Sequence, residues 1–484
     1  MKVNPGYLLL SVFLLLFCQP QVAQDITDPQ ELFSEGEFFY LAEEYEEALY
    51  FYLQLVELFP DHANYNFKVG DTYLNIPGQE YKAIPYLEIA ITNNSFKYKK
   101  RSFKEKKAPH FAYFSLGNAY RINNEIEKAL DIYQVFTSSE DFEGNYNLKM
   151  VEDEVWACER SMMIQDVPVN VEFEKLGSPV NINSDNTNAV LSGDGNTMIF
   201  ITELAFYDAI HLSKKVNGLW TEPEVLNPQV QSDGDMYPTS LSYDGRELFL
   251  VKRTEGNNDI YVSRLGTDFW SKAKALGPTI NSGTDETHAS ISADGKTLFF
   301  TSARRGGFGG LDIYRSERLE SGEWTMAENL GPVVNSIYDE DTPFLSDIGN
   351  RLYFSSSGHF NMGGYDVFYS NLDESGVWKD PINMGFPINT TTDDLFYYPI
   401  GIGNQGYISK IERQGAHAYN IYHLSIGERV TEFRDASDQT RFPDNFTIRL
   451  IHTERGDTII LQYLKDEDLF KTIDPSYKIS IEDQ

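Results

Sequence analysis

Apolar positions along the chain follow two different periods, one in each part of the sequence. Over residues 31–165, small and aromatic residues recur at helical spacings, and the set that starts at Gly36 starts again at Gly70 and at Gly117. The recurring positions are Gly36, Phe39, Ala48 and Tyr52, then Gly70, Tyr73, Ala83 and Leu87, then Gly117, Tyr120, Ala129 and Tyr133. Small residues let two helices approach closely, and aromatic residues fill the remaining space. The pattern therefore predicts three pairs of helices, closed by a last helix over 147–165.

Residues 166–426 repeat with a longer period of 50 to 54 residues. Leucine or methionine marks each repeat, a tryptophan lies six residues before four of these positions, and an apolar strand follows an Asp-Gly pair in the first three repeats. The two columns are Leu176, Leu226, Leu276, Leu330 and Met384, and Trp220, Trp270, Trp324 and Trp378. Four short strands per repeat, joined by tight turns in five tandem repeats, predict a five-bladed β-propeller.

The fifth repeat has no tryptophan-bearing outer strand of its own. The segment 168–177, PVNVEFEKLG, alternates apolar and polar residues and ends in the Leu-Gly pair that follows the outer strands elsewhere. We predict that residues 168–174 form the outer strand of the last blade, beside residues 418–424. Closing the ring in this way removes the free strand edges that an open propeller would expose. The tryptophans are expected to pack between neighbouring blades.

The two ends of the chain have patterns of their own. Residues 1–24 begin with Lys2, continue with the apolar run Leu8–Phe17 and end in small residues, which predicts a cleaved secretion signal. Lipid attachment at Cys18 is disfavoured because a bulky phenylalanine precedes it. No later segment is long and apolar enough to span a membrane. At the other end, alternating residues predict strands over 446–452, 458–463 and 477–481, the start of a small β-sandwich within residues 427–484.

Charge narrows the range of partners. The net charge of −33 repels phosphate backbones, so nucleic acid is excluded as an expected partner. One segment departs from this balance: FKYKKRSFKEKK, residues 96–107, holds seven basic residues and one acid. The basic residues are Lys97, Lys99, Lys100, Arg101, Lys104, Lys106 and Lys107. The segment is either a solvated insertion between helix pairs or a docking patch for an acidic partner surface.

Two groups of residues in the predicted propeller are candidates for ligand binding or catalysis. The loop 304–310, RRGGFGG, looks like an anion cradle, but the other repeats do not keep its arginines, so a turn between strands is favoured. An aspartate column precedes the first strand of every blade: Asp185, Asp235, Asp285, Asp339 and Asp393. These residues either cap turns or form a ring at one mouth of the channel that holds a cation, a glycan or a glycosidase site. No cofactor motif, zinc spacing or hydrolase motif is present in the sequence.

The helical part resembles the tetratricopeptide repeat, and the strand-rich part resembles the WD-like repeat of TolB. Together they are similar to a Bacteroidota family of periplasmic, OmpA-type proteins linked to type IX secretion and gliding. That resemblance implies a signal peptide (1–24), a tetratricopeptide solenoid (25–165), a propeller (166–426) and a partial carboxypeptidase-regulatory-like β domain (427–484). The family's C-terminal OmpA-like domain is missing from this sequence. The resemblance implies a periplasmic location, in the cell envelope or at the outer membrane.

We therefore expect a non-enzymatic scaffold or adaptor that binds other proteins of the cell envelope without a cofactor. A helical-repeat groove suits a peptide or a helix, and a propeller offers a rigid platform. The alternative expectation is a propeller that binds or hydrolyses glycans through the carboxylate ring.

Overall fold

A computed structural model describes residues 28–182, 184–204, 206–254, 256–411 and 419–427, together with the backbone of strands over 446–452, 458–462 and 477–483. The predicted signal at 1–24 and Cys18 lie outside the described residues. The chain divides into two compact units. One contains the described residues up to Ile76 and Lys82–Ser115, and the other contains Pro77–Tyr81 and the residues from Leu116 onward.

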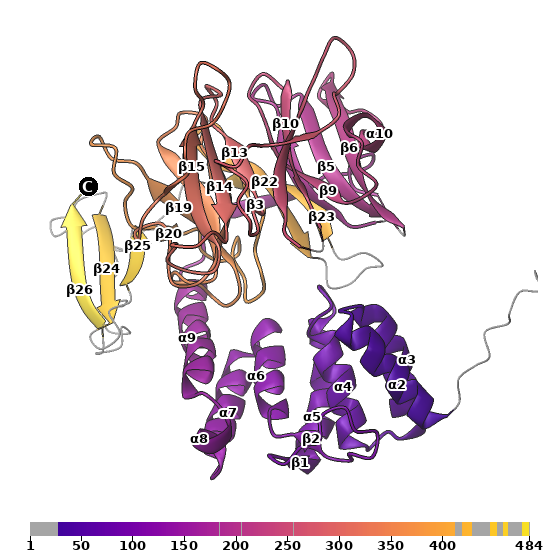
Figure 1. Ribbon diagram of the computed structural model, residues 1–484. Coiled ribbons are helices and arrows are strands. Elements are labelled where there is room, and N and C mark those ends of the chain that lie inside the picture. Colours follow the sequence, from indigo (N-terminus) through magenta and orange to yellow (C-terminus); the bar gives the residue numbers. More distant parts are fainter. Residues whose placement is uncertain are drawn as a thin grey trace, which may run out of the picture. The chain divides into compact units, whose positions relative to one another are not determined.

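Helices form most of the N-terminal region, as the apolar period predicted, and two short parallel strands, β1 (Asn94–Ser95) and β2 (Ala108–Pro109), lie between α5 and α6 (Figure 1). They are α2 (Pro29–Leu41), α3 (Tyr45–Leu58), α4 (Ala63–Tyr73), α5 (Ala83–Ala90), α6 (Ala112–Ile122), α7 (Ile126–Thr137), α8 (Phe142–Asn145) and α9 (Leu148–Gln165). The boundary between the two compact units falls inside α6, between Ser115 and Leu116.

The same close contact recurs in three helix pairs. A Cβ atom at Gly36 would lie 2.5 Å from the ring of Tyr52, and one at Gly117 would lie 2.3 Å from the ring of Tyr133. At Gly70 the neighbour is Leu87, also at 2.5 Å. Only glycine leaves room for the large residue of the second helix, which explains why glycine and a large apolar residue recur together along the sequence.

In the second unit, α6 and α9 contact the propeller. Arg121 Nε lies 2.7 Å from Glu154 Oε2 on α9, and Arg121 Nη1 donates to the carbonyl of Thr391 at 2.8 Å. The hydroxyl of Thr391 donates in turn to the carbonyl of Ile122. Tyr338 reaches α9 from another propeller loop, donating to Asp153 Oδ2 at 3.2 Å. Because Arg121 is buried and paired, this helix–propeller contact is a fixed part of the fold.

The propeller has five antiparallel sheets, and in four of them neighbouring strands follow one another in chain order. The first blade contains β4 (Asn186–Leu191), β5 (Thr197–Leu204), β6 (Tyr207–Val216), β7 (Leu219–Trp220) and β8 (Glu224–Val225), and the second contains β9 (Met236–Leu241), β10 (Glu247–Lys252), β11 (Asp259–Arg264) and β12 (Lys274–Ala275). The third blade contains β13 (Ala289–Ile291), β14 (Thr297–Ser302), β15 (Asp312–Glu317) and β16 (Glu328–Asn329). The fourth blade contains β17 (Glu340–Leu345), β18 (Arg351–Ser356), β19 (Asp366–Asn371) and β20 (Ile382–Asn383). A short helix, α10 (Asn227–Val230), lies between the first two blades.

The predicted ring closure is confirmed. The fifth blade contains β21 (Tyr398–Ile400), β22 (Gln405–Ile411) and β23 (Tyr419–Ile426), and its outer strand is β3 (Val171–Lys175). The pairing is antiparallel, from Tyr422 opposite Lys175 to Ile426 opposite Val171. The segment before the first blade therefore completes the last blade, and this pairing of β3 with β23 closes the ring.

A separate three-stranded sheet follows the propeller in the sequence. It contains β24 (Phe446–His452), β25 (Thr458–Gln462) and β26 (Tyr477–Asp483), in the order β25-β24-β26 with antiparallel pairing. These strands lie where alternation predicted them. Among the described residues, no helix has the length and apolar character needed to cross a membrane.

The tryptophan column supplies a test of blade packing. Trp324 is 8% exposed and belongs to the main apolar core, and the guanidinium carbon of Arg318 lies 4.7 Å from the centre of its ring. We expect Trp324→Ala to lower the free energy of unfolding by about 3–5 kcal/mol, because it removes a large core side chain. Met326, which is 74% exposed nearby, supplies the control Met326→Ala. Equal denaturant midpoints for the two variants would show that Trp324 has no structural role.

Candidate functional site

The aspartate column joins neighbouring blades. Asp285 Oδ1 accepts the backbone N–H of Asn258 at 2.9 Å, and Asp339 Oδ1 accepts that of Leu311 at 2.7 Å. Asp393 accepts from Tyr365 and Asp185 from Tyr419, both at 2.9 Å. In each case the N–H belongs to the preceding blade, at the start of its third strand. These four carboxylates therefore cap backbone donors at the blade junctions.

The fifth aspartate has different partners. Asp235 Oδ2 forms an ion pair with Lys252 at 2.8 Å, and Asp235 Oδ1 accepts from the hydroxyl of Ser232. The connection that leads to Asp235 contains α10 but is no longer than the others, since Asp235 lies nine positions after Leu226, as Asp285 does after Leu276. Lys252 belongs to β10, so the carboxylate is paired within its own blade.

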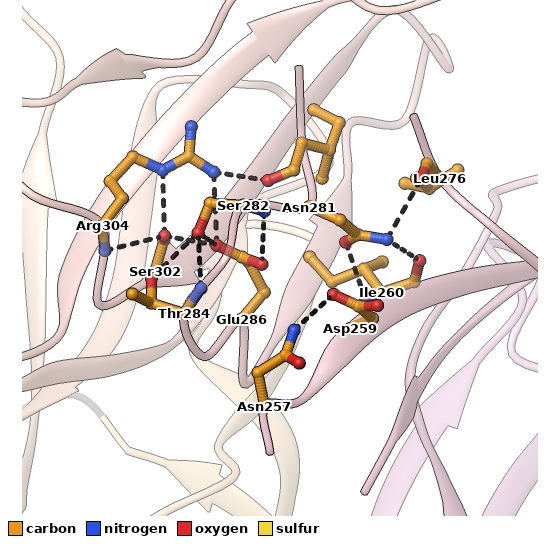
Figure 2. Close-up of polar contacts among 11 residues, drawn as sticks. Asn257, Asp259, Ile260, Leu276, Asn281, Ser282, Thr284, Glu286, Ser302 and Arg304 are labelled. Carbon is orange, nitrogen blue, oxygen red and sulfur yellow. Dashed lines mark hydrogen bonds and ion pairs between the residues drawn. The ribbon is translucent and has the colours of Figure 1, made fainter. Parts of the chain in front are cut away.

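An asparagine column was missed in the sequence, although it lies four residues before four of the aspartates. Asn281 Oδ1 accepts the N–H of Ile260, while its Nδ2 donates to the carbonyls of Ile260 and Leu276 (Figure 2). The same double contact with the third strand of the preceding blade is made by Asn181, Asn227, Asn335 and Asn389. A side-chain amide can satisfy both a donor and an acceptor, which explains why an asparagine makes this contact at all five junctions.

A second row of carboxylates lies one residue after the aspartate column in three blades. Glu286 accepts the N–H and the hydroxyl of Ser282 and the hydroxyl of Ser302, and Arg304 Nη2 lies 3.4 Å away (Figure 2). Glu340 has the matching contacts with Ser336 and Ser356. Burial raises the pKa of Glu340 to about 7, although these donors oppose the shift. Burial also raises the pKa of Asp394 to about 6, with Lys410 opposing.

The glycine-rich loop 304–310 does cradle anions, but the anions are carboxylates of the same chain. The N–H groups of Phe308 and Gly309 donate to Asp312, and the next donor along the chain, Leu311, binds Asp339. A Cβ atom at Gly309 would lie 1.7 Å from the carbonyl oxygen of Tyr338. The glycines are thus explained by close approach to the next blade.

One polar pair breaks the five-fold pattern at the first strands of two neighbouring blades. His288 Nδ1 lies 2.8 Å from Asp341 Oδ1, which also accepts from the hydroxyl of Thr287. Although burial opposes it, His288 lowers the pKa of Asp341 through its charge and its hydrogen bond. His288 is 6% exposed, and its Nε2 has no hydrogen-bond partner among the described residues. The other blades carry Asn188, Pro238, Thr342 and Phe396 at the position of His288.

The basic insert, residues 96–107, is held to the helices by its aromatic residues. Tyr98 Oη donates to Asn64 Oδ1 at 2.8 Å, and the Asn64 amide donates to the carbonyl of Glu105. Phe103 lies edge-on to Phe33 of α2, with ring centres 6.1 Å apart. Glu105 accepts the N–H groups of residues 99 and 107, and these bonds lower its pKa. The insert is therefore a fixed structure.

Its basic side chains face away from this anchor. All seven are exposed: Lys97, Lys99, Lys100, Arg101, Lys104, Lys106 and Lys107. Within the part of the chain that the structure describes, none of them is in an ion pair with a carboxylate. The preceding residues 28–95 contain thirteen acidic and two basic residues. The insert therefore presents a local positive surface on an otherwise acidic unit.

The described residues contain no group of three His, Cys, Asp or Glu side chains arranged to hold a metal ion. The aspartate column contributes to blade junctions, and the basic insert lies in the other compact unit. Whether either binds a ligand stays a prediction.

No protein-family model and no curated protein matches the chain. Solved structures match the propeller. TolB from Acinetobacter baumannii is 17% identical, with 60% of this chain and 70% of that chain covered and a TM-score of 0.33. The catalytic domain of the GH62 α-L-arabinofuranosidase of Coprinopsis cinerea is 10% identical over 54% and 97%, with a TM-score of 0.37. An α-L-arabinofuranosidase from Lactobacillus brevis is 13% identical over 63% and 95%, with a TM-score of 0.35. These likenesses concern the fold alone.

The comparisons correct one expectation. We expected a chain without enzymatic activity, and that expectation is wrong as stated, because several of the matching solved structures are glycoside hydrolases. The absence of a hydrolase domain motif was taken to exclude catalysis, but a propeller can itself be the catalytic domain.

The buried carboxyl of Glu340 supplies a test by pH. Its folded pKa of about 7 lies above the ordinary 4.5, so the folded state holds the proton more tightly and stability falls as the pH rises through this window. Between pH 5 and 8 we expect the native chain to lose about 2–3 kcal/mol more than Glu340→Gln, at about 1.4 kcal/mol per pKa unit. Chemical unfolding across this range measures it, and the contribution of Asp394 cancels because both proteins contain it. Parallel curves would show that Glu340 does not titrate there.

Proposed function

We propose that this chain is a scaffold or adaptor of the bacterial cell envelope that binds protein partners. The repeated glycine contacts between helix pairs support a tetratricopeptide solenoid, a fold that suits protein binding. The resemblance in sequence places it in the periplasm, in support of type IX secretion or gliding, and gives the last strands to a partial carboxypeptidase-regulatory-like domain.

The observation that carries the proposal is the fixed basic insert. An exposed lysine alone is usually only solvated, but here seven cations lie on one short segment whose aromatic residues are anchored on α2 and α4. Anchoring reduces the conformational entropy that the segment would lose on binding. A positive surface on a molecule of net charge −33 steers and orients an acidic protein surface.

Charge reversal tests the insert directly. We expect the triple variant Lys99→Glu/Lys100→Glu/Arg101→Glu to slow association with an envelope partner, recovered by crosslinking in native membranes. The effect should be large at low salt and shrink above about 0.15 M, where screening sets in. Stopped-flow or surface-binding kinetics against ionic strength measure it. The melting temperature should not change, because exposed charges contribute little to stability.

A matched control carries the same change in charge on the propeller. Lys272, Lys274 and Lys296 are exposed, so reversing these three to Glu alters the total charge equally without touching the insert. If both triple variants slow association alike, the effect comes from the net charge of the molecule and the insert has no docking role.

A second candidate function, glycan binding or hydrolysis at the channel, is favoured by the His288–Asp341 pair. Catalytic sites need carboxyl groups in unequal environments, and Asp341 has a lowered pKa while its neighbour Glu340 has a raised one. We expect a productive oligosaccharide to raise the melting temperature of the native chain but not that of Asp341→Asn. A panel of plant and bacterial oligosaccharides in a thermal-shift assay checks this. Equal shifts in both proteins would move the glycan site away from Asp341.

A further inference from the structure

Blade junctions of the propeller are not filled equally, and the difference is clearest beside the tryptophans. Between the second and third blades, Arg318 Nη2 lies 2.7 Å from Glu247 Oε2, and its guanidinium carbon lies 4.7 Å from the centre of the Trp324 ring. Arg264 Nε also pairs with Glu247, at 2.8 Å. This junction is therefore closed by a cation that lies between a tryptophan and a carboxylate.

The first junction lacks this closing pair. Leu265 takes the place of Arg318. The N–H of Leu265 donates to the carbonyl of Arg246, as the N–H of Arg318 donates to that of Lys296. Leu265 also forms an isolated β-bridge with Trp270, as Arg318 does with Trp324. Thr197 takes the place of Glu247, since each follows an Asp-Gly turn and its backbone carbonyl accepts the N–H of the serine at the start of that turn. Both replacements are shorter. A groove with a volume of about 500 Å³ lies here, bordered by Thr197, Leu265 and Trp270.

The third junction shows that short residues alone do not open a groove of this kind. It also has a threonine and a leucine, Thr297 and Leu372. There, however, Phe299 reaches the tryptophan of the next blade, with ring centres of Phe299 and Trp378 6.3 Å apart. The equivalent of Phe299 at the first junction is Ile199, which has no ring to fill the space.

The groove has an excess of negative groups. Four carboxylates line it, from Asp194, Glu224, Asp244 and Asp268, against the two cations Lys214 and Arg246. Arg246 already donates to the carbonyls of Leu265 and Gly266. Glu224 and Asp268 are exposed, and the described part of the chain places no cation in an ion pair with either. The space beside Trp270 therefore has the tryptophan and the negative surroundings that a guanidinium prefers, without the guanidinium.

We propose that the groove between the first two blades binds an arginine side chain of a basic, extended segment in a protein partner. The guest guanidinium takes the position that Arg318 holds at the next junction, over Trp270, and flanking residues of the segment occupy the remainder of the groove. A guest side chain alone is much smaller than the groove, so a peptide segment fits better than a free amino acid. This site is separate from the basic insert and does not depend on it.

The test uses the full chain and three blocked heptapeptides of serine and threonine that differ only at the central residue: arginine, its neutral analogue citrulline, or glutamate. Isothermal titration should show binding of the arginine peptide and weaker binding of the citrulline peptide, by about tenfold or more, since charge and cation–π contact are lost together. The glutamate peptide should not bind. Equal binding of arginine and citrulline peptides would overturn the proposal.

The chain supplies its own closing variant. Thr197→Glu/Leu265→Arg copies the pair of the next junction into the groove, and we expect it to abolish binding of the arginine peptide while the protein stays folded. The matched control, Thr297→Glu/Leu372→Arg, makes the same change at the third junction and should leave binding unchanged. If the first variant binds as the native chain does, the groove is not the site; if both variants lose binding, the effect is general and the proposal fails.

The sign of the guest's charge has a separate test. Lys214 faces the groove as the counterpart of Arg264, so Lys214→Gln should tighten binding of the arginine peptide, while Asp268→Asn should weaken it. Both side chains are exposed, so folding should be preserved, and circular dichroism checks this. The opposite pair of results, with the glutamate peptide bound best, would make the groove an anion site and overturn the proposal.

Discussion

Every blade junction of the propeller depends on side chains that satisfy backbone groups of the preceding blade. The asparagine column binds the N–H and C=O of the third strand, and in four junctions an aspartate binds the N–H just before that strand. Buried backbone groups without partners are costly, and the edge between two sheets is where such groups arise. An asparagine at every junction, joined by an aspartate at four of them, removes that cost where neighbouring sheets meet.

This dependence explains why the architecture was readable in the sequence. The aspartate and tryptophan columns recur because each junction needs the same groups, so their period gave the number of blades. The missing outer strand could be assigned to residues 168–174 because the Leu-Gly ending identified it. The helix pairs were predictable for a similar reason: Gly36 and Gly117 each meet a tyrosine ring that no larger residue would allow.

The candidate sites were less predictable, because they depend on pairs that are distant in sequence. Nothing in the RRGGFGG motif indicates that Asp312 and Asp339 accept its N–H groups. Composition showed the charge of the insert but not its anchor, since the contact of Tyr98 with Asn64 joins residues 34 positions apart. His288 and Asp341 belong to different blades, and only the closed ring brings them to 2.8 Å. The asparagine column did have a signal, the offset of four residues that separates four of the asparagines from the following aspartate, which we overlooked.

In a repeat protein, the positions that recur indicate what the fold needs, and the positions that differ indicate where a ligand could bind. A residue that recurs from blade to blade serves the junctions, and the aspartates illustrate this, because backbone donors of the preceding blade occupy four of the five carboxylates. A ligand needs one place that differs from the others. Among the described residues, three places of this kind are the insert between helix pairs, the His288–Asp341 pair, and the first blade junction, where Leu265 and Thr197 replace the pair formed by Arg318 and Glu247. Since the same scaffold contains both a filled and an open junction, the closing pair is not needed at every junction, and the open groove is free to bind a side chain of a partner.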